Sequence, residues 1–236
     1  MNEKSLNLYK NLSKFYLKLL KGKEKYISSI NNIIHSYLLD SKTLIDIGGA
    51  SGDRILKVVN NKKIDITIVD NCTEMFLNNK NNIKCVKYDI CDSTIVQYLG
   101  TKFDYATCLW NVFGHISNQN LRKIAIKNIY ELLNKDGLLF IDFNNRQNIG
   151  QYGINAIKNI VIDFFNNKES NGDFSFIKKI DGNDIDFTTH LFNENEIFEF
   201  FKQSGFKLKK MFFINYKNGK IENTKYKGNF FLIMQK

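Results

Sequence analysis

The sequence predicts an α/β fold, in which a largely parallel β-sheet carries helices on both of its faces. Short apolar segments alternate with helical patterns over residues 43–143, which is the order that parallel strands and their crossover helices produce. A run of small residues at 48–52 follows the first predicted strand and precedes a helix, as in strand–turn–helix units that bind a ligand against bare backbone. Several predicted strands also end on aspartate, so acidic side chains should gather at one edge of the sheet.

Residues 4–40 are predicted to be helical because apolar side chains recur there at spacings of three and four. One apolar stripe covers residues 6–20 and a second covers residues 26–38, with Gly22 between them. Two helices should therefore precede the first strand of the sheet.

Five strands are expected between residues 43 and 143, with helices as their connections. The strands are expected at 43–47, 64–70, 83–89, 103–110 and 138–143, and the helices at 54–59, 72–79 and 121–133. A turn separates the last of these helices from the fifth strand, and Gly137 is expected to supply the left-handed residue that caps the helix.

After residue 144 the predicted elements no longer alternate regularly. A helix, two strands, a second helix and two final strands are expected at 151–166, 174–180, 185–192, 193–204, 206–216 and 228–235. Asn193 and Glu196 have the spacing of a capping box at the start of the second helix. We expect a single domain over residues 1–236, with residues 144–190 inserted as a cap.

The composition predicts a globular, cytoplasmic protein. Hydrophobic residues make up 43% of the chain, which is ample for a core, and no apolar run approaches the roughly 20 residues that cross a bilayer. The first residues lack the apolar stretch of a signal peptide. The four cysteines have neither CxxC spacing nor a nearby histidine cluster, so we expect reduced thiols and no metal site.

The formal net charge of +10 raises the question of a nucleic-acid partner. Nearly all the basic residues are lysines spread along the chain, and the only arginines are Arg54, Arg122 and Arg146. Arginine is the residue that base and phosphate recognition usually exploits. A solvated lysine surface is therefore the favoured interpretation, with nucleic acid as the alternative partner.

The small-residue turn distinguishes between nucleotide-type ligands. A phosphate loop for ATP or GTP needs Lys-Ser or Lys-Thr after its glycines, and Arg54–Ile55 does not supply it. A dinucleotide fingerprint would bring the acid Asp53 close to a pyrophosphate, which is electrostatically unfavourable. S-adenosylmethionine carries an ammonium and a sulfonium instead, so the carboxylate of Asp46, two residues before Gly48, favours this ligand.

The ends of two later strands supply further contacts for the same ligand. Asp70, at the end of the second strand, is positioned to accept both ribose hydroxyls. Asp89, at the end of the third, can accept from the adenine amino group, and Ile90 can offer a backbone N–H to the ring. Acids at three successive strand ends beside a small-residue turn predict an S-adenosylmethionine site at this edge.

In these segments the sequence resembles the class I S-adenosylmethionine-dependent methyltransferases. The resemblance rests on residues 44–52, 68–70, 88–90 and 134–140, and it departs from the family at Ala50, where glycine is more common. It implies a Rossmann-like three-layer sandwich, with a mostly parallel seven-stranded sheet, an antiparallel last strand and a helical lid over residues 1–40. The expected cofactor-binding residues are Tyr16, Asp46, Gly48, Gly49, Ala50, Gly52, Asp70, Asn71, Met75, Asp89, Ile90, Leu109 and Trp110.

The methyl acceptor is expected where the sheet edge meets the inserted cap. Transfer from a sulfonium depends mainly on alignment and on exclusion of water, and a base matters only for a hydroxyl or a protonated amine. The expected catalytic residues are His115, Asn111, Arg146 and His190. His115 is the first choice for a general base or substrate contact, with a buried structural histidine as the alternative. Arg146 would hold a carboxylate or phosphate, with a salt bridge in its loop as the equal alternative.

Residues 103–116 and 137–146 resemble glycine/sarcosine-type and amino-sugar N-methyltransferases locally. The chain contains no proline, so it lacks the Pro-Pro motif that DNA adenine and protein glutamine methyltransferases carry after the fourth strand. We predict methyl transfer to N or O of a small polar metabolite, such as a sugar or phosphate-bearing precursor of a surface glycan. An RNA methyltransferase and a non-catalytic cofactor-binding partner subunit are the alternatives. A homodimer is one assembly that we consider.

Overall fold

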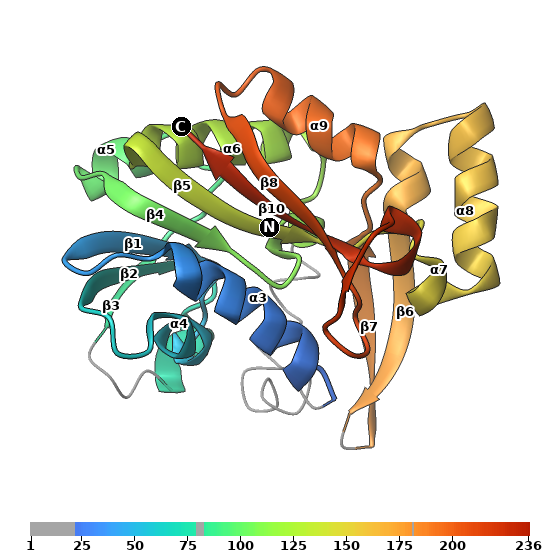
Figure 1. Cartoon of the computed structure of the whole chain (residues 1–236), viewed down its shortest axis with the longest axis horizontal. Helices are drawn as coiled ribbons and strands as arrows, with labels where there is room; N and C mark the ends of the chain where they lie inside the picture. Colours follow the sequence, from blue (N-terminus) through green and yellow to red (C-terminus); the bar gives the residue numbers. More distant parts are fainter. Residues whose placement is uncertain (1–21, 79–82, 181) are drawn as a thin grey trace.

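The computed structural model describes residues 22–78, 83–180 and 182–236 (Figure 1). Its α-helices are α3 Glu24–Tyr37, α4 Asp53–Val59, α5 Ile95–Leu99, α6 Gln119–Leu132, α7 Ile149–Tyr152, α8 Ile154–Phe165 and α9 Glu194–Lys202. Its strands are β1 Lys42–Ile47, β2 Ile64–Asp70, β3 Lys84–Lys87, β4 Phe103–Cys108, β5 Leu133–Phe143, β6 Asp173–Ile180, β7 Asn183–His190, β8 Lys207–Ile214, β9 Ile221–Glu222 and β10 Asn229–Gln235. Short 3-10 helices are η1 Thr73–Asn78, η2 Val112–His115, η3 Glu169–Gly172 and η4 Lys225–Lys227. The predicted helix at 6–20, with Tyr16, lies outside the described residues.

Within the described residues, the strands form a large sheet of eight strands and a separate pair, β6 and β7. The order in the large sheet is β3-β2-β1-β4-β5-β10-β8-β9. Strands β1 to β5 pair in parallel with one another, whereas β10 lies antiparallel between β5 and β8. The predicted, mostly parallel sheet with an antiparallel last strand is confirmed, and the short strand β9 adds an edge strand to the seven expected.

Alternate residues of the central strands face two separate hydrophobic cores. On β10, Phe230 and Leu232 belong to the core that contains α6 and α9, whereas Phe231 and Ile233 belong to the core that contains α3 and α4. A strand that is buried on both faces shows this period of two with apolar residues throughout. Helices therefore cover both faces of the sheet, and the predicted three-layer arrangement is confirmed (Figure 1).

One predicted helix cap is wrong and one predicted helix is interrupted, and in both cases the backbone conformation gives the reason. Gly137 does not cap α6, because β5 begins directly after the helix and the left-handed residue there is Asp136, with φ of 62°. The helix expected at 151–166 is split into α7 and α8 at Gly153, whose φ of 56° interrupts the helical geometry.

Three elements near the expected site also differ from the prediction. The strand β3 ends at Lys87, so Asp89 lies in the following loop and not on the strand. The helix expected at 72–79 is the 3-10 helix η1. The strand β4 ends at Cys108, two residues early, because the backbone turns sharply at Trp110.

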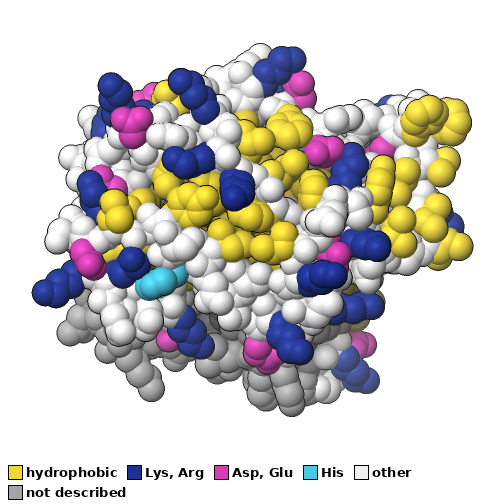
Figure 2. Space-filling model, viewed as in Figure 1, with side chains coloured by type: hydrophobic (Ala, Val, Ile, Leu, Met, Phe, Trp, Pro, Cys, Tyr) yellow, Lys and Arg dark blue, Asp and Glu magenta, His cyan; other side chains and the backbone are white. Residues whose placement is uncertain are grey.

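The segment after β5 projects from one side of the large sheet (Figure 1). It contains the antiparallel pair β6 and β7 with α8 beside it, and a bridge between Asn145 and Phe192 joins its two ends. One side of α8 is apolar and exposed, and Figure 2 shows hydrophobic side chains gathered over this helix. The exposed residues are Ile154, Ile157, Val161, Ile162, Phe164 and Phe165. That residues 144–190 cover a substrate stays a prediction.

Helix α9 begins as the sequence predicts. The Asn193 side chain accepts from the Glu196 N–H at 3.0 Å, and the Glu196 carboxylate accepts from the Asn193 N–H at 3.0 Å, which completes the capping box. None of the helices in the described part of the chain combines the length and the apolar character that a bilayer-spanning helix needs.

Candidate active site

The turn between β1 and α4 requires glycine at three positions because neighbouring side chains crowd the backbone, and at Gly52 an added Cβ atom would lie 2.7 Å from Ile68 Cδ1. A Cβ atom on Gly48 would lie 2.6 Å from Val112 Cγ2, and a Cβ atom on Gly49 would collide with the carboxylate of Asp46. Gly48 also has a φ of 69°, which L-residues with a side chain rarely adopt. The turn therefore brings bare backbone to the carboxyl edge of the sheet, where the sequence predicts it.

Ala50 shows how the chain accommodates its departure from glycine. Its φ is 51°, a left-handed conformation that costs a residue with a Cβ atom about 1–2 kcal/mol. The Ala50 methyl group packs in a small buried cluster with Cys72 and Met75, and burying one such group contributes about 0.8 kcal/mol. The packing offsets part of the strain. Met75 therefore stabilises the turn by packing against the Ala50 methyl group.

Asp70 connects the end of β2 to the turn. Its Oδ2 accepts from the Ala50 N–H at 3.2 Å, and its Oδ1 accepts from the Cys72 N–H at 2.9 Å. Burial raises the pKa of this carboxyl group, and the backbone donors act against that shift. Each oxygen keeps a further lone pair with which it can accept from a ligand hydroxyl.

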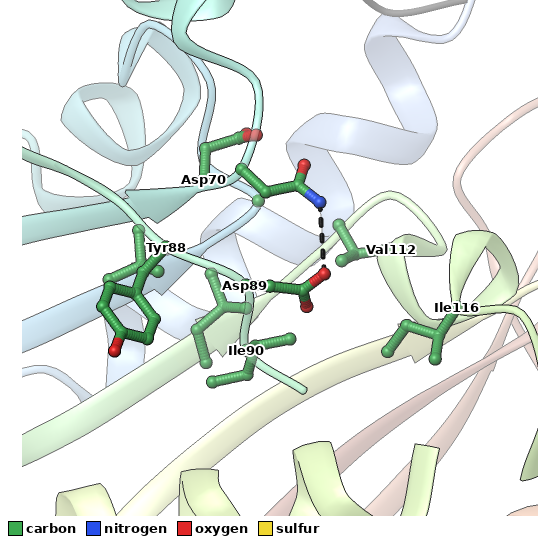
Figure 3. Close-up of a pocket in the computed structure, with 10 residues that line it drawn as sticks. Asp70, Tyr88, Asp89, Ile90, Val112 and Ile116 are labelled. Carbon is green, nitrogen blue, oxygen red and sulfur yellow. Dashed lines mark hydrogen bonds between the residues drawn. The ribbon is translucent and has the colours of Figure 1, made fainter. Parts of the chain in front are cut away.

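A pocket lies at the ends of β1, β2 and β3 (Figure 3). Its lining residues are Ile47, Gly48, Val69, Asp70, Asn71, Tyr88, Asp89, Ile90, Val112 and Ile116. Five of the predicted cofactor-binding residues, Gly48, Asp70, Asn71, Asp89 and Ile90, come together here. The pocket pairs acidic side chains with apolar ones, which suits a ribose joined to a flat ring.

Asn71 carries a buried atom that a ligand would satisfy. Its Nδ2 donates to Asp89 Oδ2 at 3.4 Å (Figure 3), whereas its Oδ1 is buried and has no hydrogen-bond partner in the described part of the chain. A buried acceptor without a donor is costly. The Oδ1 atom therefore indicates a ligand that brings a hydroxyl or amino group into this pocket.

Two further acids are buried close to the turn, Asp46 on β1 and Asp142 on β5. Asp46 accepts from the Thr107 hydroxyl at 2.7 Å, and Asp142 accepts from the Tyr26 hydroxyl at 3.2 Å and from the Asn111 N–H at 2.8 Å. Burial raises the pKa of Asp46 to about 6 and also raises that of Asp142. A nearby cation would stabilise both carboxylates in their charged form.

Arg54, in the first turn of α4, lies close enough to act on both acids. It lowers the pKa of Asp46 and of Asp142, against the larger effect of burial. Its Nε donates to Asn31 Oδ1 at 3.2 Å, but Nη1 and Nη2 are buried and have no hydrogen-bond partner within residues 22–78, 83–180 and 182–236. Two buried guanidinium nitrogens without partners fit the two oxygens of a carboxylate.

Arg54, Asp142 and Tyr26 are not among the residues predicted from the sequence. A signal existed for two of them, because Asp142 lies near the end of a predicted strand and Arg54 is one of three arginines and directly follows the turn. Tyr26 falls on an ordinary apolar helical stripe. Only the packing of α3 against the sheet brings its hydroxyl to Asp142.

The chain leaves β4 through two consecutive residues in the left-handed region, Trp110 with φ of 73° and Asn111 with φ of 57°. Leu109, just before them, is buried in the core on the α3 side. The Asn111 side chain holds this bend, because its Oδ1 accepts from the Asn144 N–H at 2.9 Å and its Nδ2 donates to Thr189 Oγ1 at 3.1 Å. Strain of this kind concentrates at functional sites.

His115 lies in the setting of the alternative prediction, a buried histidine, and its role as a general base stays a prediction. It is buried at the end of η2, and burial lowers its pKa to about 4. Its neighbour Ile116 lines the pocket of Figure 3, but His115 itself is not among the lining residues. At neutral pH the ring is therefore uncharged and a weak proton acceptor.

Arg146 and His190 are both engaged in a buried network at the base of the projecting segment, and a contact of either with the acceptor stays a prediction. The Arg146 guanidinium pairs with Asp163 of α8 at 2.9 Å and with Glu196 of α9. His190 Nδ1 bonds Asp173 at 2.8 Å. Both side chains are at most 1% exposed, so they fasten the segment to the sheet.

Comparison with known proteins gives one family match over most of the chain. A family model described as a methyltransferase domain matches residues 19–210. An uncharacterized protein of Methanocaldococcus jannaschii is 28% identical over 228 residues, which cover 93% of this chain and 83% of that protein.

Solved structures share the fold at low sequence identity. An S-adenosylmethionine-dependent methyltransferase from Clostridium acetobutylicum has a TM-score of 0.65 at 16% identity, over 96% of this chain and 98% of that one. An amino pentose methyltransferase from Micromonospora echinaspora, solved with S-adenosylmethionine bound, has a TM-score of 0.60 at 12% identity, over 93% and 95% of the two chains.

Proposed function

The chain belongs to the class I, S-adenosylmethionine-dependent methyltransferases, and from this premise we propose that it transfers a methyl group to a nitrogen or oxygen atom of a small polar metabolite. The observation that carries the proposal is the set of polar groups around the turn. Asp70 and Asp89 line the pocket where the ribose and adenine would bind, and the buried Nη1 and Nη2 atoms of Arg54 have no hydrogen-bond partner among the described residues.

The residues at this edge fit S-adenosylmethionine along its whole length. The ribose hydroxyls would bind Asp70, and the adenine would lie beside Asp89 and Ile90 in the pocket of Figure 3. The ligand carboxylate would satisfy Nη1 and Nη2 of Arg54, and the ligand ammonium would lie near Asp46. Each charged group of the ligand then has a group of opposite charge.

When bound, the cofactor supplies a methyl group that is already activated on a sulfonium. The contribution of the chain is to align the acceptor and to exclude water. Asn111 holds the exit of β4 in its strained conformation and so orients Trp110. We assign His115 a positioning role in the same loop, since a group with a pKa of about 4 is a poor general base.

The proposed acceptor is small because residues 144–190 project beside the sheet edge and would enclose it. The likeness in fold to an amino pentose methyltransferase supports a sugar-like acceptor. The scarcity of arginine among the basic residues argues against RNA.

Calorimetric titration with S-adenosylmethionine and S-adenosylhomocysteine tests the donor site, and transfer of a labelled methyl group to a metabolite panel tests the acceptor. We expect saturable binding of both ligands and transfer to a small metabolite. Salt-sensitive transfer to RNA would contradict the small acceptor. Binding without transfer to any compound would favour a non-catalytic subunit, and binding of neither ligand would overturn the proposal.

We expect the affinity for S-adenosylmethionine to rise between about pH 5 and about pH 7. Burial raises the pKa of Asp46 to about 6, so at lower pH this carboxyl is mostly protonated and must release its proton when the cationic ligand binds. Affinity is therefore lost as the pH falls through about 6. Calorimetry across this range measures the slope, which Asp46→Asn should reduce. The uncharged ligand 5′-methylthioadenosine is the control, and an equal slope for it would contradict the explanation.

A further inference from the structure

Three aromatic rings from distant parts of the chain meet next to the exit of β4. The ring of Tyr26 on α3 lies 6.4 Å from that of Trp110 and 5.1 Å from that of Tyr216, between centroids. Trp110 and Tyr216 are 6.5 Å apart. We call these three residues the aromatic cluster. Trp110 and Tyr216 are half-buried, so their rings reach the surface, whereas Tyr26 is buried.

The carboxylate of Asp142 is hydrogen-bonded to the buried ring of the aromatic cluster, that of Tyr26. The Tyr26 hydroxyl donates to Asp142 Oδ2 at 3.2 Å, and the Asn111 N–H donates to Asp142 Oδ1 at 2.8 Å. Asp142 acts on Tyr216 as well, because burial and then this carboxylate raise the pKa of Tyr216 to about 12. Negative charge therefore lies directly behind rings whose faces are themselves electron-rich.

The aromatic cluster already holds one ammonium group. Lys23 Nζ lies 4.0 Å from the centre of the Tyr216 ring, which is the geometry of a cation–π contact. Recognition of ligand ammonium groups is a common use of clustered aromatic rings, and a carboxylate beside them adds to the attraction. The chemistry of this surface matches a cation better than a neutral hydroxyl compound.

We propose that the aromatic cluster and Asp142 bind the methyl acceptor as an ammonium ion, so that the enzyme methylates the nitrogen of a small amine. The inference rests on the proposed function and narrows its acceptor to one chemical class. Trp110 directly follows Leu109 at the exit of β4, on the side of the sheet where the turn and Asp46 lie. The ammonium would therefore sit at the same edge as the donor.

The reaction balances with groups that are on hand. The ammonium would first lose one proton to water, which leaves an electron pair on nitrogen. That pair would form an N–C bond with the methyl carbon while the C–S bond breaks, and the electrons of the broken bond would stay on sulfur as a neutral thioether. The product would be an N-methylammonium ion. Asp142 is 2% exposed and lies behind the rings, so it contributes its negative charge and is not the proton acceptor. An alcohol carries no positive charge, so the rings and this carboxylate would not attract it in the same way.

The single tryptophan of the chain makes the inference directly measurable, because Trp110 fluorescence reports on the aromatic cluster alone. Choline is the cationic probe and 3,3-dimethyl-1-butanol is its uncharged isostere, each titrated into the protein saturated with S-adenosylhomocysteine. We expect choline to quench Trp110 saturably and to bind about ten-fold more tightly than the isostere. Equal affinity of the two probes, or no response to choline, overturns the inference.

Variants distinguish a direct contact between choline and the Tyr216 ring from a general effect on folding. Tyr216→Leu should weaken choline binding about ten-fold and Tyr216→Phe should retain it, since the face of the ring carries the interaction. Tyr226→Leu is the matched control, because Tyr226 also lies in the C-terminal loop with a lysine over its ring. Loss of choline binding in Tyr216→Phe or in Tyr226→Leu, or its retention in Tyr216→Leu, contradicts the inference. Failure of the unmodified protein to bind S-adenosylhomocysteine would instead overturn the proposed function.

Discussion

Replacing Asp70 with alanine is expected to weaken the binding of both S-adenosylmethionine and S-adenosylhomocysteine by about a hundredfold, or about 3 kcal/mol. The carboxylate would lose its charge-assisted bonds to the ribose hydroxyls. The variant would also lose the hydrogen bond of 3.2 Å that the Ala50 N–H donates to Asp70, and this bond holds the turn in place. Calorimetry with the two ligands and with 5′-methylthioadenosine measures the effect, and all three should be weakened because all three carry the ribose.

The matched control for this variant is Asp65→Ala. Asp65 lies on the same strand as Asp70 but is exposed, near the opposite end of β2. Its removal should leave the affinity for all three ligands unchanged. If circular dichroism shows that Asp70→Ala is folded and its affinity for the ligands is unaltered, Asp70 does not contact the ribose.

Replacing Arg54 with methionine is expected to reduce the affinity for S-adenosylmethionine and S-adenosylhomocysteine by roughly thirty-fold, or about 2 kcal/mol. Both ligands carry the carboxylate that Nη1 and Nη2 of Arg54 are proposed to bind. The ligand 5′-methylthioadenosine has the same adenosine but no amino-acid end. Its affinity should change little, so the pair of ligands assigns the loss to one end of the site.

Lys57→Met is the control for Arg54→Met, because Lys57 is an exposed cation on the same helix. This variant tests whether losing one positive charge anywhere on the helix weakens the binding of a ligand carboxylate through long-range attraction. A uniform loss of affinity for all three ligands in Arg54→Met would show that the arginine supports the turn and does not bind the carboxylate.

The agreement between sequence and structure is best where the signal is local. The turn at 48–52 and Asp70 could be predicted because a tight approach of backbone requires small residues and because parallel strands end at one edge. The capping box of Asn193 and Glu196 was found in the same way, from a spacing of three residues. Such features depend on neighbours in the chain and little else.

The agreement is poorest where function depends on which distant groups surround a side chain. The chemistry of their side chains makes His115, Arg146 and His190 candidates for the site, whereas burial and ion pairing set what each side chain can do. Arginine is rare in the sequence, which makes Arg146 a candidate for a substrate contact or a salt bridge, and in the structure its guanidinium pairs with Asp163 and Glu196. No pattern along the chain predicts these partners, which are supplied by α8 and α9.

The order of strands and helices, the class of sheet and the turn that identifies the methyl donor can all be inferred from the chain, because each follows from periodicity or short-range sterics. Which polar groups of the described residues lack a hydrogen-bond partner depends on how the elements pack. Arg54 next to the turn and the aromatic cluster around Asp142 became visible when α3, β4, β5 and β8 were packed together. Desolvation and contact between residues more than a hundred positions apart, such as Tyr26 and Asp142, are properties of the fold.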